Sequence, residues 1–108
     1  MNSSKEYLEY VMEKLSPIGD VKGRAMFGGY GIFHDGSMFA LISEDSLYFK
    51  VNDSNRDIYE KAGSRKFVHG ISYWEVPIEV LEDNDKLHEW ANLSVIVAHE
   101  AAKKKKRR

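Results

Sequence analysis

Four strand-like segments with very short connections lie between Val21 and Val51, and they constrain the fold more than any other feature of the sequence. In this stretch the apolar residues recur with the two-residue period of a strand, and turn-forming residues such as Asp35-Gly36 separate the segments. A parallel crossover needs about a dozen residues or more, so strands connected this closely can pair only antiparallel. The sequence therefore predicts an antiparallel meander.

Helical periodicity is found on both sides of the meander. Before it, a helix is expected from Ser4 to Leu15. After it, we expect a short helix over 54–62, a strand over 72–76, and a long helix with an apolar face that starts near residue 84. Helices and a mostly antiparallel sheet in this order predict an α+β fold, with the helices packed on one face of the sheet.

Composition restricts the class of protein. The length of 108 residues suits one domain with a core of its own, which we expect to span residues 1–102. The absence of cysteine excludes disulfides, thiolate zinc sites and cysteine nucleophiles. The start of the chain has no apolar signal core, and no apolar run reaches the roughly 18 residues of a membrane span. We therefore expect a cytoplasmic protein.

Charge is distributed very unevenly along the chain. The first 102 residues hold ten Lys and Arg against seventeen Asp and Glu, a net charge of -7. The last six residues are all basic: Lys103, Lys104, Lys105, Lys106, Arg107 and Arg108. A basic block attracts polyanions such as nucleic acid, whereas an acidic body repels them. Two plainer interpretations of this basic tail stay open, namely cations that complement a helix dipole and a solvated chain end.

The least generic stretch runs from Arg24 to Gly31 and reads Arg-Ala-Met-Phe-Gly-Gly-Tyr-Gly. Three glycines within four positions weaken a strand, which indicates a bulge, positive φ angles or a close approach of another backbone. The plain interpretation is a sharp corner between two strands. A binding role for the corner is the alternative.

Several ordered motifs resemble those of one family: residues 24–31, the Met-Phe-Ala-Leu run at 38–41, residues 47–51, and Tyr-Trp-Glu-Val-Pro at 73–77. In this order they resemble the amino-terminal domain of the TfoX (Sxy) competence regulators, from the first helix to about Ala102. The resemblance implies an α+β fold and a role in transcriptional control of DNA uptake, through coactivation beside a DNA-bound regulator. The best-known members carry a further carboxy-terminal domain, so we expect a stand-alone amino-terminal module.

The resemblance directs attention to a protein partner rather than a substrate. The expected partner-binding residues are Arg24, Phe27, Gly28, Gly29, Tyr30 and Trp74. Large aromatic side chains often concentrate the energy of an interface. Tyr30 and Trp74 could equally fill the core between sheet and helices, and the sequence leaves both interpretations open.

The sequence contains none of the common motifs of catalytic or phosphate-binding sites. The glycines lack the spacing of a phosphate-binding loop, and no nucleophile elbow is present. The four histidines, His34, His69, His88 and His99, show no metal-ligand spacing, and we expect each on the surface. His34 with Asp35, or His69 with Glu75, could form an acid–base pair only if the fold brings the two side chains together. We predict no enzyme activity, no cofactor and no metal.

Binding of nucleic acid is the alternative function. The basic tail would supply most of the affinity. Further basic and aromatic candidates on or near strands are Lys22, Arg24, Tyr48, Lys50, Arg65 and Lys66.

Overall fold

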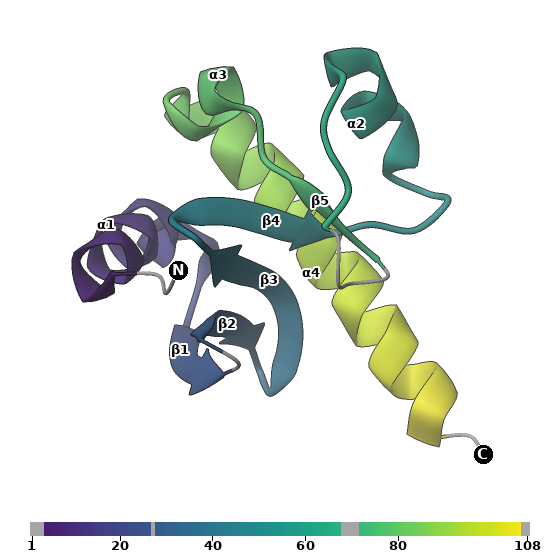
Figure 1. Ribbon diagram of the computed structural model, residues 1–108. Coiled ribbons are helices and arrows are strands. Elements are labelled where there is room, and N and C mark those ends of the chain that lie inside the picture. The colour runs from purple at the N-terminus through teal and green to yellow at the C-terminus, as the bar shows by residue number, and fades with distance from the viewer. Residues whose placement is uncertain (1–3, 27, 68–71, 107–108) are drawn as a thin grey trace.

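A curved antiparallel sheet forms the centre of the computed structural model, which describes residues 4–26, 28–67 and 72–106 (Figure 1). Its strand order in this part of the chain is β1-β2-β3-β4-β5, so each strand pairs with its neighbour in sequence. The strands are β1 (Val21–Met26), β2 (Gly29–His34), β3 (Ser37–Ser43), β4 (Ser46–Lys50) and β5 (Tyr73–Glu75). The predicted meander and α+β fold are confirmed.

The three helices that the sequence predicts are present, and two short ones accompany them in the described residues. They are α1 (Lys5–Leu15), the short 3-10 helix η1 (Ser16–Ile18), α2 (Arg56–Ala62), α3 (Ile78–Leu81) and α4 (Asn84–Lys106). Ser4 caps α1, because its hydroxyl accepts a hydrogen bond from the Tyr7 N–H at 3.1 Å. The backbone N–H of Ser4 donates to Asp45 at 2.8 Å, which joins the start of α1 to the β3–β4 turn.

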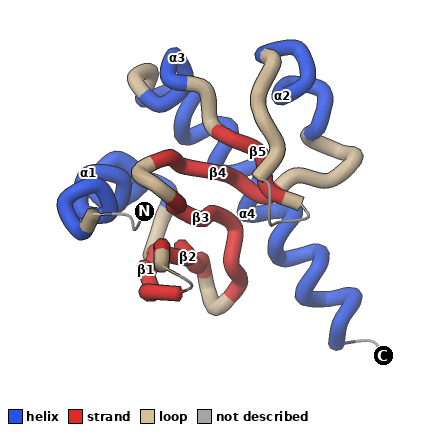
Figure 2. The backbone as a smooth tube through the Cα atoms, viewed as in Figure 1, coloured by secondary structure: helices blue, strands red, loops and turns tan. Residues whose placement is uncertain are grey.

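Helix α4 lies across the sheet behind β3 and β4, and its C-terminal end extends beyond the strands (Figures 1 and 2). Leu87 and Ala91 are fully buried on its inner face. Ser94 is also buried, and its hydroxyl donates to the Lys50 carbonyl of β4 at 2.7 Å. None of the helices in the described ranges is both long enough and apolar enough to cross a membrane.

A β-bulge in β3 allows two consecutive side chains of this strand to be buried in the core. Ile32 of β2 faces Ala40, whereas the next residue, Phe33, faces Met38, so Phe39 has no partner across the ladder. Phe39 and Ala40 are consecutive, yet both are fully buried. In a regular strand they would point to opposite faces. The bulge therefore adds one aromatic side chain to the core, where Phe39 lies 6.1 Å from the ring of Phe49.

A second aromatic cluster closes the core at the far edge of the sheet, where α2, β5 and α4 meet. The buried ring of Tyr59 lies 4.6 Å from that of Trp90 and 6.2 Å from that of Trp74. Trp74 is only 9% exposed, and the ammonium of Lys66 lies 5.2 Å from its ring centre. Burial raises the pKa of Tyr59 well above its usual range. Trp74 is thus a core residue in this structure.

We predict that Trp74→Ala lowers the free energy of unfolding by about 3 kcal/mol or more, because it opens a cavity beside Tyr59. Urea denaturation followed by circular dichroism measures the change. The matched control is Ile78→Ala, at an apolar side chain that is 59% exposed, for which we expect a change within about 0.5 kcal/mol. Equal stability of the two variants would contradict the core assignment of Trp74.

Candidate interaction surface on the open face of the sheet

The two faces of the β1–β2 hairpin differ in what covers them. Gly23 pairs with Ile32, and a side chain at Gly23 would meet Leu8 of α1 at 3.1 Å, so these positions face the helices. Arg24 pairs with Gly31, one residue along on each strand. Because side chains alternate along a strand, Arg24 and Gly31 belong to the opposite, open face.

Three apolar side chains gather over Gly31 on this open face. A Cβ at Gly31 would lie 2.7 Å from Sδ of Met26, 3.0 Å from Sδ of Met38 and 3.2 Å from the ring of Phe33. A larger residue at position 31 would push the two flexible methionine side chains aside. All three are half-buried rather than enclosed.

Two exposed cations complete this surface. The guanidinium carbon of Arg24 lies 5.6 Å from the ring centre of Phe33, which is a cation–π contact. Lys22 pairs with Phe33 across the ladder. Together Lys22, Arg24 and Phe33 line a depression, with Asp20, Gly23, Asp35 and Gly36 around them. We name Lys22, Arg24, Met26, Phe33 and Met38 the corner surface.

The glycines of the β1–β2 turn, Gly28 and Gly29, lie beside the corner surface, and the backbone geometry explains why both are glycine. Gly28 is exposed in the β1–β2 turn with a φ of 79°, a conformation that favours glycine. A Cβ on Gly29 would collide with the Ile42 carbonyl oxygen of β3. The backbones of β2 and β3 thus approach closely here, as the run of glycines predicts. Phe27 lies outside the described residues.

The other predicted partner residues are not brought together with Arg24. Tyr30 points to the helix side, where it is half-buried and packs against the core. Trp74 is buried in β5, at the opposite edge of the sheet from β1. Sequence reasoning missed Met26, Phe33 and Met38. The alternation i, i+2 from Arg24 indicates Met26, but Phe33 and Met38 depend on strand register and on the bulge.

The remaining basic candidates on or near the strands contact other side chains of the protein itself. The Lys50 ammonium lies 5.1 Å from the ring centre of Tyr73, and the Arg65 Nε donates to Glu75 at 3.1 Å. Burial raises the pKa of Tyr73 to about 12, and its hydroxyl donates to the Met38 carbonyl at 3.3 Å. Tyr48 packs edge-on against Phe67 with ring centres 5.0 Å apart. This end of the open face is a packed surface in which each cation has a partner.

The basic tail begins inside a helix. Helix α4 continues through Lys106, and the side chains of Lys103 and Lys104 are exposed in its last turns. Cations at the C-terminal end of a helix can complement its dipole, so this plain interpretation of the tail stays open beside nucleic-acid contact.

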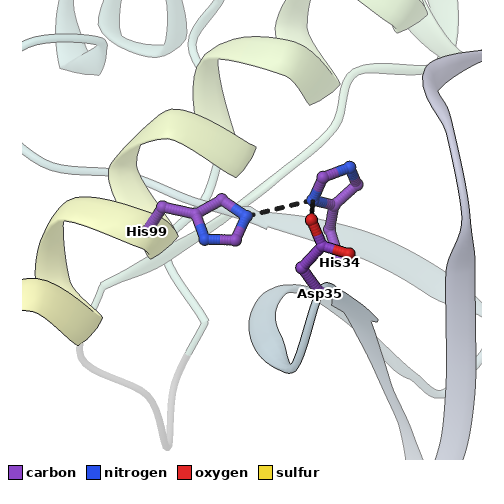
Figure 3. A group of neighbouring side chains, drawn as sticks. All are labelled: His34, Asp35 and His99. Atoms are coloured by element: carbon purple, nitrogen blue, oxygen red, sulfur yellow. Dashed lines mark hydrogen bonds and ion pairs between the residues drawn. The ribbon is translucent and has the colours of Figure 1, made fainter.

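Each histidine is expected on the surface, whereas His34 and His99 are half-buried and contact each other. The Nδ1 of His34 lies 3.0 Å from Nε2 of His99, although the residues are 65 positions apart (Figure 3). The β2–β3 hairpin and α4 bring them together, which no local spacing could indicate. His88 instead contacts the Lys14 carbonyl through Nε2 at 2.8 Å. His69 lies outside the described residues, so its pairing with Glu75 does too.

Comparison with known proteins agrees with the fold. The model of the TfoX N-terminal domain family matches residues 13–98, which include every strand of the sheet. Over 52 residues the chain is 33% identical to the DNA transformation protein TfoX1 of Aliivibrio fischeri. That match covers 48% of this chain and 25% of the relative, so three quarters of the relative's length lie outside the match. The match of the family model over most of the chain shows that it belongs to the TfoX N-terminal domain family.

Proposed function

We propose that the chain is a non-enzymatic regulatory domain that supports DNA transformation by binding a protein partner, a DNA-bound transcription regulator in the cytoplasm. The observation that carries this proposal is the family match over residues 13–98. The relative in Aliivibrio fischeri is named a DNA transformation protein, which supplies the process. The corner surface lies within the matched range and is the interface we propose.

The chemistry of the corner surface suits a protein ligand. Met26 and Met38 are flexible and polarizable side chains, which adapt to irregular apolar partners. Arg24 stacked on Phe33 combines an aromatic anchor with a positive charge, two features enriched at interface hot spots. The partner segment that fits best is an apolar one with an acidic residue placed against Arg24 and Lys22.

The net charge supports protein over nucleic acid as the main partner of this surface. The first 102 residues carry a net charge of -7, and Asp20 and Asp35 stand around the same depression as Lys22 and Arg24. A field of this sign repels a polyphosphate backbone. An acidic protein segment of few charges can still pair with two local cations at short range, because salt screens the more distant charges.

We predict that Arg24→Glu lowers transformation frequency at least about tenfold, the effect of losing about 1.4 kcal/mol at an interface hot spot. The measurement is uptake of a marker DNA by host cells in which the native gene is replaced by each variant. Because Arg24 is exposed, we expect the stability of the domain to change by no more than about 0.5 kcal/mol.

The matched control is Lys5→Glu, which makes the same charge change at an exposed position in the first turn of α1. An acidic residue is favoured at that end of a helix, so the control should fold and transform as the wild type does. Equal transformation by wild type and Arg24→Glu would contradict the proposed interface. Normal transformation after deletion of the gene would contradict the proposed process.

Nucleic-acid contact through the basic tail is the second candidate function. The observation that favours it is the exposure of Lys103 and Lys104 at the end of α4, which projects beyond the sheet (Figure 1). With the following residues they form a block of six cations. Such a block would bind phosphates without reading sequence.

A titration of duplex DNA with the full chain and with a chain ending at Ala102 tests this candidate. If the tail neutralises six phosphates, log affinity falls by about 5 per decade of salt, and the truncated chain loses binding with its fold intact. Equal binding by both chains would place the contact elsewhere. No binding by either would leave the tail as a solvated helix end.

A further inference from the structure

We propose that His34, Asp35 and His99 form a binding site for a divalent transition-metal ion, which would join the β2–β3 turn to α4. One ligand atom from each residue lies within 4.8 Å of the other two. The Nδ1 of His34 is 3.0 Å from Nε2 of His99 and 3.8 Å from Oδ2 of Asp35. Figure 3 shows the two rings and the carboxylate converging from the hairpin and the helix. This site is independent of the proposed function.

The distances suit an ion with only a small adjustment. Zinc–nitrogen bonds of about 2.0–2.1 Å in tetrahedral geometry place two ligand nitrogens about 3.3 Å apart. The two nitrogens here are 3.0 Å apart, so the rings need to separate by a few tenths of an ångström and to turn until both lone pairs point at the ion. The carboxylate of Asp35 is already on the same side and is 75% exposed, so it is free to turn toward the ion.

A neighbouring side chain orients one of the rings. The hydroxyl of Ser37 lies 3.5 Å from Nδ1 of His99. A proton on that nitrogen, directed at the hydroxyl, leaves Nε2 of His99 with a free lone pair. Metal-ligating histidines commonly use their second nitrogen in this way, and the contact fixes the tautomer and the ring orientation.

Binding of the ion requires no net loss of a proton from the neutral pair. In the tautomer that keeps the His99 proton on Nδ1, the metal-free Nε2 of His99 accepts the Nδ1 proton of His34 across the 3.0 Å contact. When the ion takes both lone pairs, the proton of His34 leaves Nδ1 for the solvent and Nε2 of His34 takes one up. Two imidazoles and one carboxylate then bind the ion, and water completes its coordination.

The ligand set identifies the class of ion. Imidazole nitrogens favour zinc, copper, nickel and iron, whereas magnesium and calcium prefer oxygen ligands. Both histidines are half-buried, which holds the rings in place, and the exposed Asp35 side leaves room for water. Zinc is the ion used in the test, because it has no redox chemistry that would add heat or paramagnetic effects to calorimetry and NMR.

The test is calorimetric titration of the full, untagged chain with zinc chloride, together with nitrogen-detected NMR of the histidine rings. We expect saturable binding of one ion per chain and zinc-dependent shifts at Nδ1 of His34 and Nε2 of His99. His88 should keep its signals, since it contacts the Lys14 carbonyl away from the cluster. A zinc-dependent rise in melting temperature should accompany binding.

Variants separate a metal site from a hydrogen-bonded pair. His99→Gln should abolish binding, and Asp35→Asn should weaken it at least about tenfold. Asp35 has a φ of 48°, a conformation that asparagine tolerates, so Asp35→Asn should keep the fold. The matched control His88→Gln should bind zinc as tightly as the wild type.

The proposal is overturned if zinc does not saturate at one ion per chain, if His88 shifts as strongly as His34, or if His99→Gln binds as the wild type does. Any of these results would reduce the cluster to a hydrogen bond between the hairpin and α4.

Discussion

The packing of α4 against β3 and β4 is the contact on which the rest of the structure depends. It buries Leu87 and Ala91 of the helix against the sheet, and Ser94 ties it to the Lys50 carbonyl at 2.7 Å. Because α1 and α4 lie on the same side, the opposite side of the β1–β2 hairpin keeps no helix above it in the described part of the chain. The corner surface and the His34–His99 contact both follow from this one-sided arrangement.

Much of the fold could be predicted because short connections leave few choices. The Asp35-Gly36 turn and the alternation in β4 fix an antiparallel meander without any knowledge of tertiary structure. The glycine-rich stretch also indicated a close approach, which the structure places between Gly29 and the Ile42 carbonyl. The bulge at Phe39 was beyond prediction, because it depends on how β3 fits under α4.

The site was harder to predict than the fold. Arg24 could be identified from its place beside the glycines, but its partners Phe33 and Met38 lie on other strands and depend on register. Trp74 has the side chain of an interface hot spot, yet it fills the core beside Tyr59, so residue type alone could not decide. The His34–His99 pair joins segments 65 positions apart, and no periodicity connects them.

The most direct test of the account is site-specific photo-crosslinking in competent host cells. An aromatic crosslinking amino acid replaces Phe33 in the corner surface and, in a matched control, Tyr10 on α1, which is 42% exposed. We expect position 33 to capture a DNA-bound transcription regulator and position 10 not to capture it. Capture of the same regulator from both positions, or of nucleic acid alone at position 33, would contradict it.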